Sequence, residues 1–149
     1  MQLRGFIVTE QNGRYLLIKE EGNDWEGQWF LPGGKADEDE TPENAARREG
    51  WEETGKQIIL QGIFYVEYFT GDYESVHVYY KAELHEPAEG MSKPEKLPHS
   101  GWFAPDEMAD MPLRQNLAKV IEAYNRAEEL LPPASFNLSE FRNKKEGTS

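Results

Sequence analysis

Two long runs of strand-forming residues constrain the fold of this chain most strongly. Residues 57–69 (QIILQGIFYVEYF) and 74–84 (ESVHVYYKAEL) are rich in β-branched and aromatic side chains, the residue types that favour extended strands. Gly71-Asp72 lies between the two runs and supplies turn-forming residues. We therefore expect two long strands joined by this turn.

Further strands are predicted on either side of this pair. Residues 3–9 (LRGFIVT) and 14–20 (RYLLIKE) flank Asn12-Gly13, a dipeptide typical of a β-hairpin turn. The polar, glycine-rich residues 20–29 are predicted to form a loop, and a short strand is expected at 101–104. Together these segments predict a mixed, largely antiparallel sheet.

Two helices are predicted, one in the middle of the chain and one near its end. Thr41 is a suitable N-cap and Pro42 a suitable first residue for a helix over 42–54, and Gly55 is a natural C-cap. A second helix is expected over 113–131, where apolar residues recur at helical spacing. Its apolar stripe consists of Leu113, Leu117, Val120, Ile121, Tyr124 and Leu131.

The chain has the size and composition of one globular domain. It has 149 residues, of which 38% are hydrophobic and 12% aromatic, so it can bury a sizeable core. We expect a single domain over residues 1–133. Pro132-Pro133 precedes a polar tail, residues 134–149, which is expected to be mobile.

Charge and cysteine content exclude several function classes. The net charge is −12 and no basic stripe offsets it, so binding to a nucleic acid polymer or an anionic membrane is not expected. The chain has no cysteines, which excludes disulfides, thiolate zinc sites and cysteine nucleophiles. No apolar run approaches the roughly 20 residues of a membrane span, and the N-terminus lacks the layout of a signal peptide. We expect a cytoplasmic protein, either a monomer or a homodimer.

The stretch RREGWEETG (residues 47–55) concentrates acidic side chains on one face of the predicted helix. Glu49, Glu52 and Glu53 occupy positions i, i+3 and i+4, where like charges repel by roughly 0.2–0.5 kcal/mol. Oxygen ligands grouped in this way suit hard cations such as Mg²⁺ and Mn²⁺. The same residues are also compatible with a solvated acidic helix face. Spacing alone leaves both interpretations open.

The segment 34–56 as a whole resembles the Nudix box, Gly-x5-Glu-x7-Arg-Glu-U-x-Glu-Glu-x-Gly-U, where U is a bulky aliphatic residue. The matching residues, all at the expected spacing, are Gly34, Glu40, Arg48, Glu49, Glu52, Glu53 and Gly55. Gly50 and Lys56 stand at the two U positions and depart from the pattern. Residues 27–35 (GQWFLPGGK) also resemble the usual lead-in of the family. The resemblance implies an α/β (α+β) fold, the Nudix-type α/β/α sandwich with a mixed, largely antiparallel sheet.

The resemblance also implies a hydrolase that cleaves a nucleoside diphosphate linked to another moiety, with Mg²⁺ or Mn²⁺ as cofactor. Glu49, Glu52 and Glu53 match the metal-ligand glutamates of the motif, and Glu49 also matches the general base proposed in some members. The Gly34 carbonyl is a further expected ligand. A bound cation would neutralise the diphosphate and lower the pKa of the attacking water. The residues expected to support this geometry are Glu40 and Arg48.

Several residues outside the box are candidates for the site. Nudix hydrolases often add a fourth carboxylate, for which we favour Glu95, with Asp72 and Glu74 as alternatives. Glu95 is also compatible with a solvated loop acid. Lys19, at the end of a predicted strand, is expected to reach a substrate phosphate. Aromatic candidates for stacking on a nucleobase, each also compatible with a place in the core, are Phe6, Trp29 and Tyr79.

The compact form of the chain resembles the MutT-type group of Nudix hydrolases. We therefore expect a nucleotide as substrate, a nucleoside di- or triphosphate and possibly an oxidised one. Hydrolysis of ADP-ribose or a nucleotide sugar is the alternative within the same chemistry. A non-catalytic, nucleotide-binding Nudix module is an alternative of a different class, which the intact box glutamates disfavour.

The departure at Gly50 concerns packing. A U residue normally packs the metal-binding helix on the sheet, so Gly50 either lets that helix approach more closely or leaves a gap for a bulky neighbour. We expect Gly50→Leu either to lower stability by overpacking or to be nearly neutral. Lys56 is expected to keep its stem on apolar surface and its amine in water.

Overall fold

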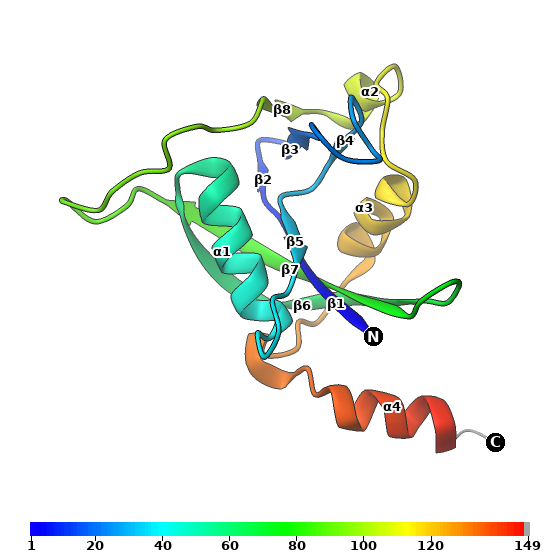
Figure 1. Ribbon diagram of the computed structural model, residues 1–149. Coiled ribbons are helices and arrows are strands. Elements are labelled where there is room, and N and C mark those ends of the chain that lie inside the picture. The colour runs from blue at the N-terminus through cyan, green and yellow to red at the C-terminus, as the bar shows by residue number, and fades with distance from the viewer. Residues whose placement is uncertain (148–149) are drawn as a thin grey trace.

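The computed structural model describes residues 1–147 and contains two β-sheets and four α-helices (Figure 1). The large sheet has the strand order β5-β1-β7-β6, and only its β1–β7 pair is parallel. Its strands are β1 (Gln2–Val8), β5 (Gly33–Lys35), β6 (Gln57–Phe69) and β7 (Ser75–His85). The small sheet is antiparallel. Its strands are β2 (Glu10–Gln11), β3 (Arg14–Lys19), β4 (Trp29–Phe30) and β8 (Ser100–Phe103).

The turn at Asn12-Gly13 forms as predicted and leads into the predicted second strand, but the strand before the turn is not the predicted one. Asn12 and Gly13 have φ angles of 54° and 76°, as a tight hairpin turn requires. This turn connects only the two-residue β2 to β3. The preceding run, β1, leaves the hairpin and pairs with β5 and β7 instead. The two runs that we expected to pair with each other therefore belong to different sheets.

The predicted middle helix, α1 (Pro42–Thr54), covers one face of the large sheet (Figure 1). The Thr41 hydroxyl accepts a hydrogen bond from the Asn44 amide at 3.2 Å, and Gly55 ends the helix with a φ of 67°. The bounds predicted from the capping residues are therefore confirmed. Lys56 follows, and its amine forms an ion pair with Glu86 near the surface.

Gly50 lets α1 lie close to the sheet. A Cβ atom at Gly50 would come within 2.8 Å of Ile58 Cγ1 and 3.6 Å of Ile7 Cδ1, and a contact under about 3 Å forces a neighbour to move. Gly50, Ala45 and Ala46 are all buried. Of the two interpretations of Gly50, close approach of α1 to the large sheet is therefore confirmed.

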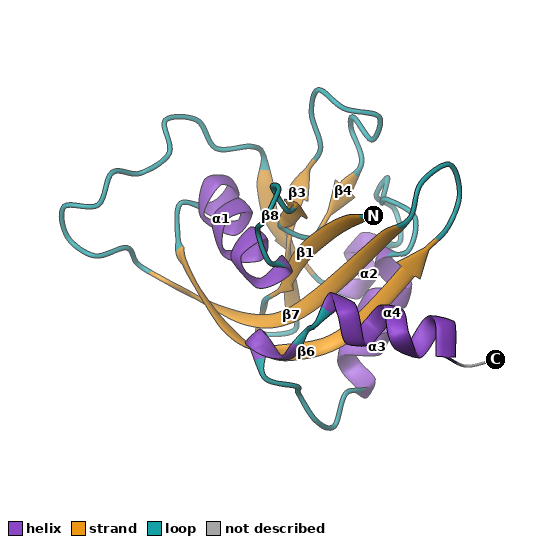
Figure 2. Cartoon of the chain, turned by 60° about the horizontal axis from the view of Figure 1, so that its bottom comes forward, coloured by secondary structure: helices purple, strands orange, loops and turns teal. Residues whose placement is uncertain are grey.

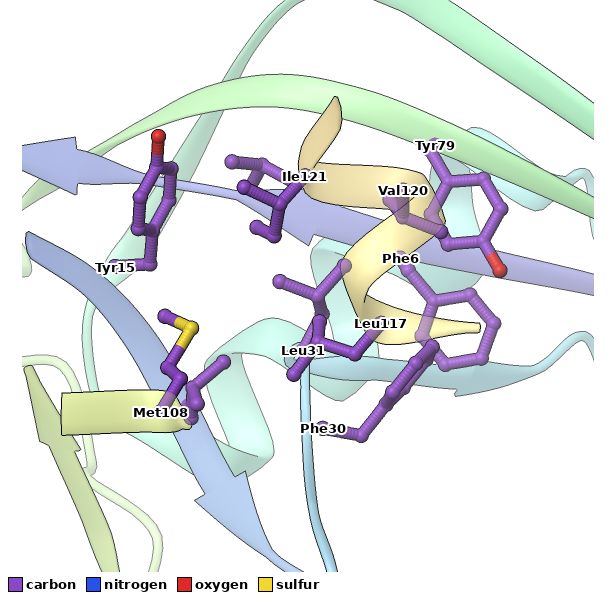
Figure 3. Close-up of a cluster of buried hydrophobic side chains, with 11 residues drawn as sticks. Phe6, Tyr15, Phe30, Leu31, Tyr79, Met108, Leu117, Val120 and Ile121 are labelled. Atoms are coloured by element: carbon purple, nitrogen blue, oxygen red, sulfur yellow. The ribbon is translucent and has the colours of Figure 1, made fainter. Parts of the chain in front are cut away.

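The other face of the large sheet packs on α3 (Leu117–Arg126) and on the small sheet. Figure 3 shows this core, in which Phe6 of β1 and Tyr79 of β7 lie close to Val120 and Leu117 of α3. The Phe6 and Tyr79 rings stack with their centroids 5.5 Å apart. The layers are thus helix, sheet and helix, which confirms the predicted sandwich.

The second helix is shorter than the predicted 113–131. It begins at Leu117 because Asn116 has a left-handed φ of 82° and its side-chain amide reaches the buried Glu67 carboxylate at 3.4 Å. It ends at Arg126, and Leu131 instead pairs with Ile63 of β6 through two backbone hydrogen bonds. Four residues of the predicted stripe, Leu117, Val120, Ile121 and Tyr124, form the apolar face of α3. The prediction was wrong for Leu113 and Leu131, which lie in extended segments.

The remaining helices lie outside the predicted pattern. The short α2 (Pro105–Met108) follows β8, and α4 (Leu138–Gly147) forms within the segment that was predicted as a tail. Figure 2 shows α4 in front of the strands of the large sheet. The Phe141 ring centroid of α4 lies 5.8 Å from the Tyr68 ring centroid of β6. Residues 148 and 149 of the predicted tail lie outside the described residues. Within residues 1–147, no helix has the length and apolar character needed to cross a membrane.

Candidate active site

A cleft of about 360 Å³ opens where α1, β1, the end of β3 and the loop between β3 and β4 meet. Its carboxylates come from α1 and from the residues that follow β3. Its basic side chains come from β1, from β3 and from the segment before α3. The lining residues on which the chemistry depends are Arg4, Lys19, Glu20, Trp25, Glu49, Glu53 and Arg114.

The box glutamates lie at different depths along α1. Glu49 and Glu53 line the cleft, whereas Glu52 is exposed, with 51% of its side chain accessible. The backbone N–H of Gly33 donates a hydrogen bond to Glu53 Oε1 at 2.7 Å. This bond connects α1 to the turn that leads into β5.

Glu53 carries a carboxylate without a cationic partner within 4 Å among residues 1–144. Burial raises its pKa to about 8, and the nearby charges of Glu49, Glu20 and Glu52 act in the same direction. Only the Gly33 amide opposes these effects. The group is therefore poised between its protonated and charged forms near neutral pH. Burial likewise raises the pKa of Glu49, although Arg48 opposes that change.

Arg48 holds the acidic groups of the box in one arrangement. Its Nε and Nη2 atoms donate hydrogen bonds to the two carboxylate oxygens of Glu40, at 3.0 and 2.9 Å. Its Nη1 atom donates to Glu49 Oε1 at 3.0 Å and lies 3.6 Å from Glu52 Oε1. These bonds lower the pKa of Glu40 and raise that of Arg48. Arg48 thus bridges Glu40 to the cluster.

Gly33 and Gly34 allow the backbone to approach this cluster. A Cβ atom at Gly34 would lie 3.0 Å from Glu49 Cδ, and one at Gly33 would lie 2.2 Å from the Gly5 carbonyl oxygen. Gly33 also has a φ of 139°, which L-residues rarely adopt. The Pro32-Gly33-Gly34 turn therefore brings the backbone against Glu49.

The donor chemistry of the cleft fits a hard divalent cation. Glu49 and Glu53 offer carboxylate oxygens whose charges the described residues only partly neutralise, and Mg²⁺ and Mn²⁺ prefer such ligands. In the described part of the chain, no three acidic or histidine side chains converge closely enough to enclose an ion. Arg48 Nη1 instead contacts two of the box carboxylates, Glu49 at 3.0 Å and Glu52 at 3.6 Å.

Of the residues predicted outside the box, some line the cleft and others do not. Lys19 lines the cleft. Trp29 does not line it, and packs edge-on against Phe103 with the ring centroids 5.1 Å apart. Phe6 lines the cleft floor but is only 1% exposed, and Tyr79 is fully buried. These positions argue against stacking of a nucleobase on Phe6, Trp29 or Tyr79.

The favoured fourth carboxylate, Glu95, lies in the loop between β7 and β8. Figure 2 shows this loop extending outwards past α1. Glu95 is exposed and does not line the cleft, although its neighbour Pro98 does. The alternatives Asp72 and Glu74 also lie outside the cleft. Among the described residues, the acidic side chains that join Glu49 and Glu53 there are Glu20 and Glu21.

The sequence did not predict two residues that line the cleft, Arg114 and Trp25. Arg114 is 9% exposed and forms an ion pair with Glu20 at 2.9 Å. Its guanidinium carbon lies 3.9 Å from the Trp25 ring centroid and 4.3 Å from that of Phe30. A tryptophan within a polar, glycine-rich loop was the available signal for Trp25. No local pattern marked Arg114, whose partners are distant in the sequence.

Burial and the positive charges of Arg4 and Arg114 lower the pKa of a histidine beside the cleft, His77. His77 lies next to Phe6, with the ring centroids 5.5 Å apart. Burial lowers the pKa of His77 to about 3, and the charges of Arg4 and Arg114 act in the same direction. The histidine is therefore neutral at physiological pH, and the positive charge at this end of the cleft comes from the arginines.

The comparisons with known proteins point to one family. The NUDIX domain matches residues 3–124 of the chain. A MutT-like protein of Streptomyces ambofaciens is 29% identical over 127 residues, which cover 81% of this chain and 75% of that protein. The nucleoside triphosphatase NudI of Salmonella agona is 45% identical over 58 residues, which cover 38% of this chain and 41% of that protein.

A solved structure supports the same fold. The Nudix hydrolase from Nitrosomonas europaea superposes with a TM-score of 0.73 at 20% identity, and the match covers 91% of this chain and 95% of that one. The arrangement of α1 and α3 on the two faces of the large sheet agrees with this match. The chain therefore belongs to the NUDIX family of MutT-like hydrolases.

Proposed function

We propose that this protein is a Mg²⁺- or Mn²⁺-dependent pyrophosphohydrolase that cleaves a phosphoanhydride bond of a nucleoside di- or triphosphate. The observation that carries the proposal is the composition of the cleft. Glu49 and Glu53 face the same 360 Å³ space as the basic side chains of Lys19 and Arg4. Carboxylates that take a cation, beside cations that take phosphate oxygens, are complementary to a metal–nucleotide complex.

The proposed metal ligands are Glu49, Glu52, Glu53 and the Gly34 carbonyl. A divalent cation held there supplies positive charge against the diphosphate and lowers the pKa of the attacking water. Of the three box glutamates, Glu49 and Glu52 contact Arg48, whereas Glu53 has no salt bridge among the described side chains. Glu52, exposed at the surface, has the freedom to turn towards the cleft once Arg48 no longer attracts it.

Glu49 is the proposed proton acceptor. Its pKa is raised from the ordinary value by burial, which makes a carboxylate a better base near neutral pH. The Arg48 Nη1 hydrogen bond orients Glu49, and Glu40 in turn fixes Arg48. Arg48 thus acts as a positioning residue. Lys19, whose amine has no carboxylate within 4 Å among residues 1–144, is available to bind a substrate phosphate.

The similarity to a MutT-like protein and, over a shorter segment, to a nucleoside triphosphatase favours nucleoside phosphates as the substrate class. Within that class, a nucleotide with an oxidised base is included. ADP-ribose and nucleotide sugars contain the same phosphoanhydride bond and belong in the same test.

The test is a panel of nucleoside di- and triphosphates, 8-oxo-dGTP, ADP-ribose and UDP-glucose, with Mg²⁺, with Mn²⁺ and with EDTA. The products are identified by ³¹P NMR and liquid chromatography. We expect a nucleoside monophosphate from the preferred nucleotide with either metal, and no product with EDTA. Hydrolysis of ADP-ribose or UDP-glucose alone would reassign the substrate. If the wild type binds nucleotides but turns over no member of the panel, the protein is a binding module.

A further inference from the structure

We infer that Trp25 is the platform on which the aromatic base of the substrate stacks, and that Arg114 is the residue that holds this platform in place. The inference rests on the proposed nucleotide substrate and deepens it, because it identifies the side chain that recognises the base. It follows from three observations: an ordered loop, a buried stacked arginine and an accessible indole in the catalytic cleft.

The loop that carries Trp25 is held by a dense set of hydrogen bonds. The Gly27 amide donates to the Glu20 carbonyl and the Glu20 amide to the Gln28 carbonyl, each at 2.8–2.9 Å. The Trp25 amide donates to Asn23 Oδ1 at 2.9 Å, and Asn23 Nδ2 donates to Glu20 Oε2 at 2.8 Å. An indole on such a loop has little conformational freedom left to lose on binding.

Arg114 fixes the indole from one side. Its guanidinium carbon lies 3.9 Å from the ring centroid of Trp25 and 4.3 Å from the ring centroid of Phe30. Glu20 accepts a hydrogen bond from Arg114 Nη1 at 2.9 Å and so compensates the buried charge. A guanidinium gains most from an aromatic ring when both are withdrawn from water. Arg114 therefore connects the loop, β4 and the start of α3 at the indole.

Trp25 keeps accessible surface on the cleft. Its side chain is half-buried, and it lines the same space as Glu49 and Glu53. Among the described residues that line this space, the aromatic side chains are Trp25 and Phe6, and Phe6 is only 1% exposed. Trp25 is thus the aromatic side chain that a ligand in the cleft can contact.

Arg4 adds hydrogen-bond donors beside this platform. Its guanidinium carbon lies 5.8 Å from the Trp25 centroid. Its guanidinium donates a hydrogen bond to the Gln2 side-chain oxygen at 3.2 Å, and among residues 1–144 no carboxylate lies within 4 Å of it. In a chain of net charge −12, an arginine without an acidic partner at a cleft is available to the polar edge of a bound base or to a phosphate.

The experiment compares ligands that carry a base with a ligand that lacks one. Nucleoside monophosphates (AMP, GMP, CMP and UMP) and ribose 5-phosphate are titrated by calorimetry in the presence of Mg²⁺, and tryptophan fluorescence is followed in parallel. The proteins are the wild type, Trp25→Leu and Trp25→Phe. Trp51→Phe is the matched control, because Trp51 is a half-buried tryptophan of α1 that does not line the cleft. Thermal melts verify that each variant is folded.

We expect the best nucleoside monophosphate to bind more tightly than ribose 5-phosphate to the wild type and to quench its fluorescence. Trp25→Leu should lower the nucleotide affinity by about tenfold, a typical loss for one base stack, leave ribose 5-phosphate unchanged and abolish the quenching. Trp25→Phe should restore most of the affinity, and Trp51→Phe should behave as the wild type. Arg114→Lys, which keeps the charge but loses the planar stack, should weaken nucleotide binding and spare ribose 5-phosphate.

Equal binding of the two ligand types to the wild type would overturn the inference. So would a Trp25→Leu variant that weakens both ligands equally or neither of them, which would assign the indole to loop stability alone. The outcome is separable from the proposed function. Nucleotide turnover with a KM unchanged in Trp25→Leu rejects the platform and keeps the enzyme, whereas base-dependent binding without turnover keeps the platform and rejects the enzyme.

Discussion

The backbone N–H of Gly33 donates a hydrogen bond to Glu53 Oε1 at 2.7 Å, although twenty residues separate the two in the sequence. The bond joins the glycine turn to α1 and directs the Glu53 carboxylate into the cleft. It is also the only contact in the described chain that offsets the burial of this charge. The properties of Glu53 therefore provide the most direct tests of the site.

Glu53→Gln should abolish most of the activity without unfolding the protein. The amide oxygen of glutamine can still accept the Gly33 hydrogen bond, but the charge that attracts a cation is lost. We expect kcat/KM to fall by on the order of a hundredfold or more, while the melting temperature without metal stays equal or rises. Glu43→Gln, on the same helix but outside the cleft, is the control. Full activity of Glu53→Gln would remove Glu53 from the site.

The pKa of Glu53 predicts how the stability of the metal-free protein varies with pH. The folded pKa is about 8, above the ordinary value of 4.5, so the folded state retains a proton that the unfolded chain has already released. Stability should therefore decrease as the pH rises from about 5 to 8 and level off above that range. The decrease is on the order of a few kcal/mol and should be smaller in Glu53→Gln.

Denaturant unfolding at pH 6 and pH 9 in EDTA measures this effect for both proteins. Addition of Mg²⁺ should stabilise the wild type more at pH 9 than at pH 6, because the cation competes with the proton for the carboxylate. An identical pH dependence in the wild type and in Glu53→Gln would contradict the assignment.

The Glu40–Arg48 pair should control metal affinity more than turnover. Glu40 accepts two hydrogen bonds from Arg48 at 2.9 and 3.0 Å. Glu40→Ala frees the guanidinium to bind Glu49 and Glu52 more tightly, so a cation must compete harder for them. We expect the Mg²⁺ concentration for half-maximal activity to rise by about 10–100-fold, with kcat at saturating Mg²⁺ within a few-fold of the wild type.

Asp37→Asn is the matched control for this pair. Asp37 also faces Arg48, at 3.6 Å, but 75% of its side chain is exposed, so its loss should change little. A large fall in kcat in Glu40→Ala at saturating Mg²⁺, with an unchanged metal requirement, would show that Glu40 acts in the reaction itself.

Gly50→Leu should destabilise the protein. The structure leaves 2.8 Å between a Cβ at this position and Ile58 Cγ1, so a larger side chain must push α1 away from the sheet at a cost of about 1–3 kcal/mol. Urea unfolding measures the loss. In an Ile58→Ala background, which removes the atom that clashes, Gly50→Leu should cost less or become stabilising. A rise of several degrees in the melting temperature of the single variant would show that Gly50 is merely a packing defect.

Sequence patterns predicted the structure correctly where residues close together in the sequence determine it. The bounds of α1 follow from Thr41 and Gly55, which act within one turn of the helix. The predicted second helix was too long because periodicity cannot register that Leu131 finds a strand partner in Ile63. The hairpin turn was identified, but the partner of β1 was not, because parallel pairing with β7 joins residues about seventy positions apart.

The same division applies to the site. The 3.6-residue period of a helix determines the spacing of Glu49, Glu52 and Glu53, so the sequence by itself determined the acidic box and the turn glycines that face it. Only the tertiary structure decided which other side chains share the cleft. Glu20 and Arg114 lie 94 positions apart, and their pairing beside Trp25 depends on how the small sheet and α3 close over the large sheet. An ion pair of this kind leaves no periodic trace in the sequence, because it depends on packing between layers.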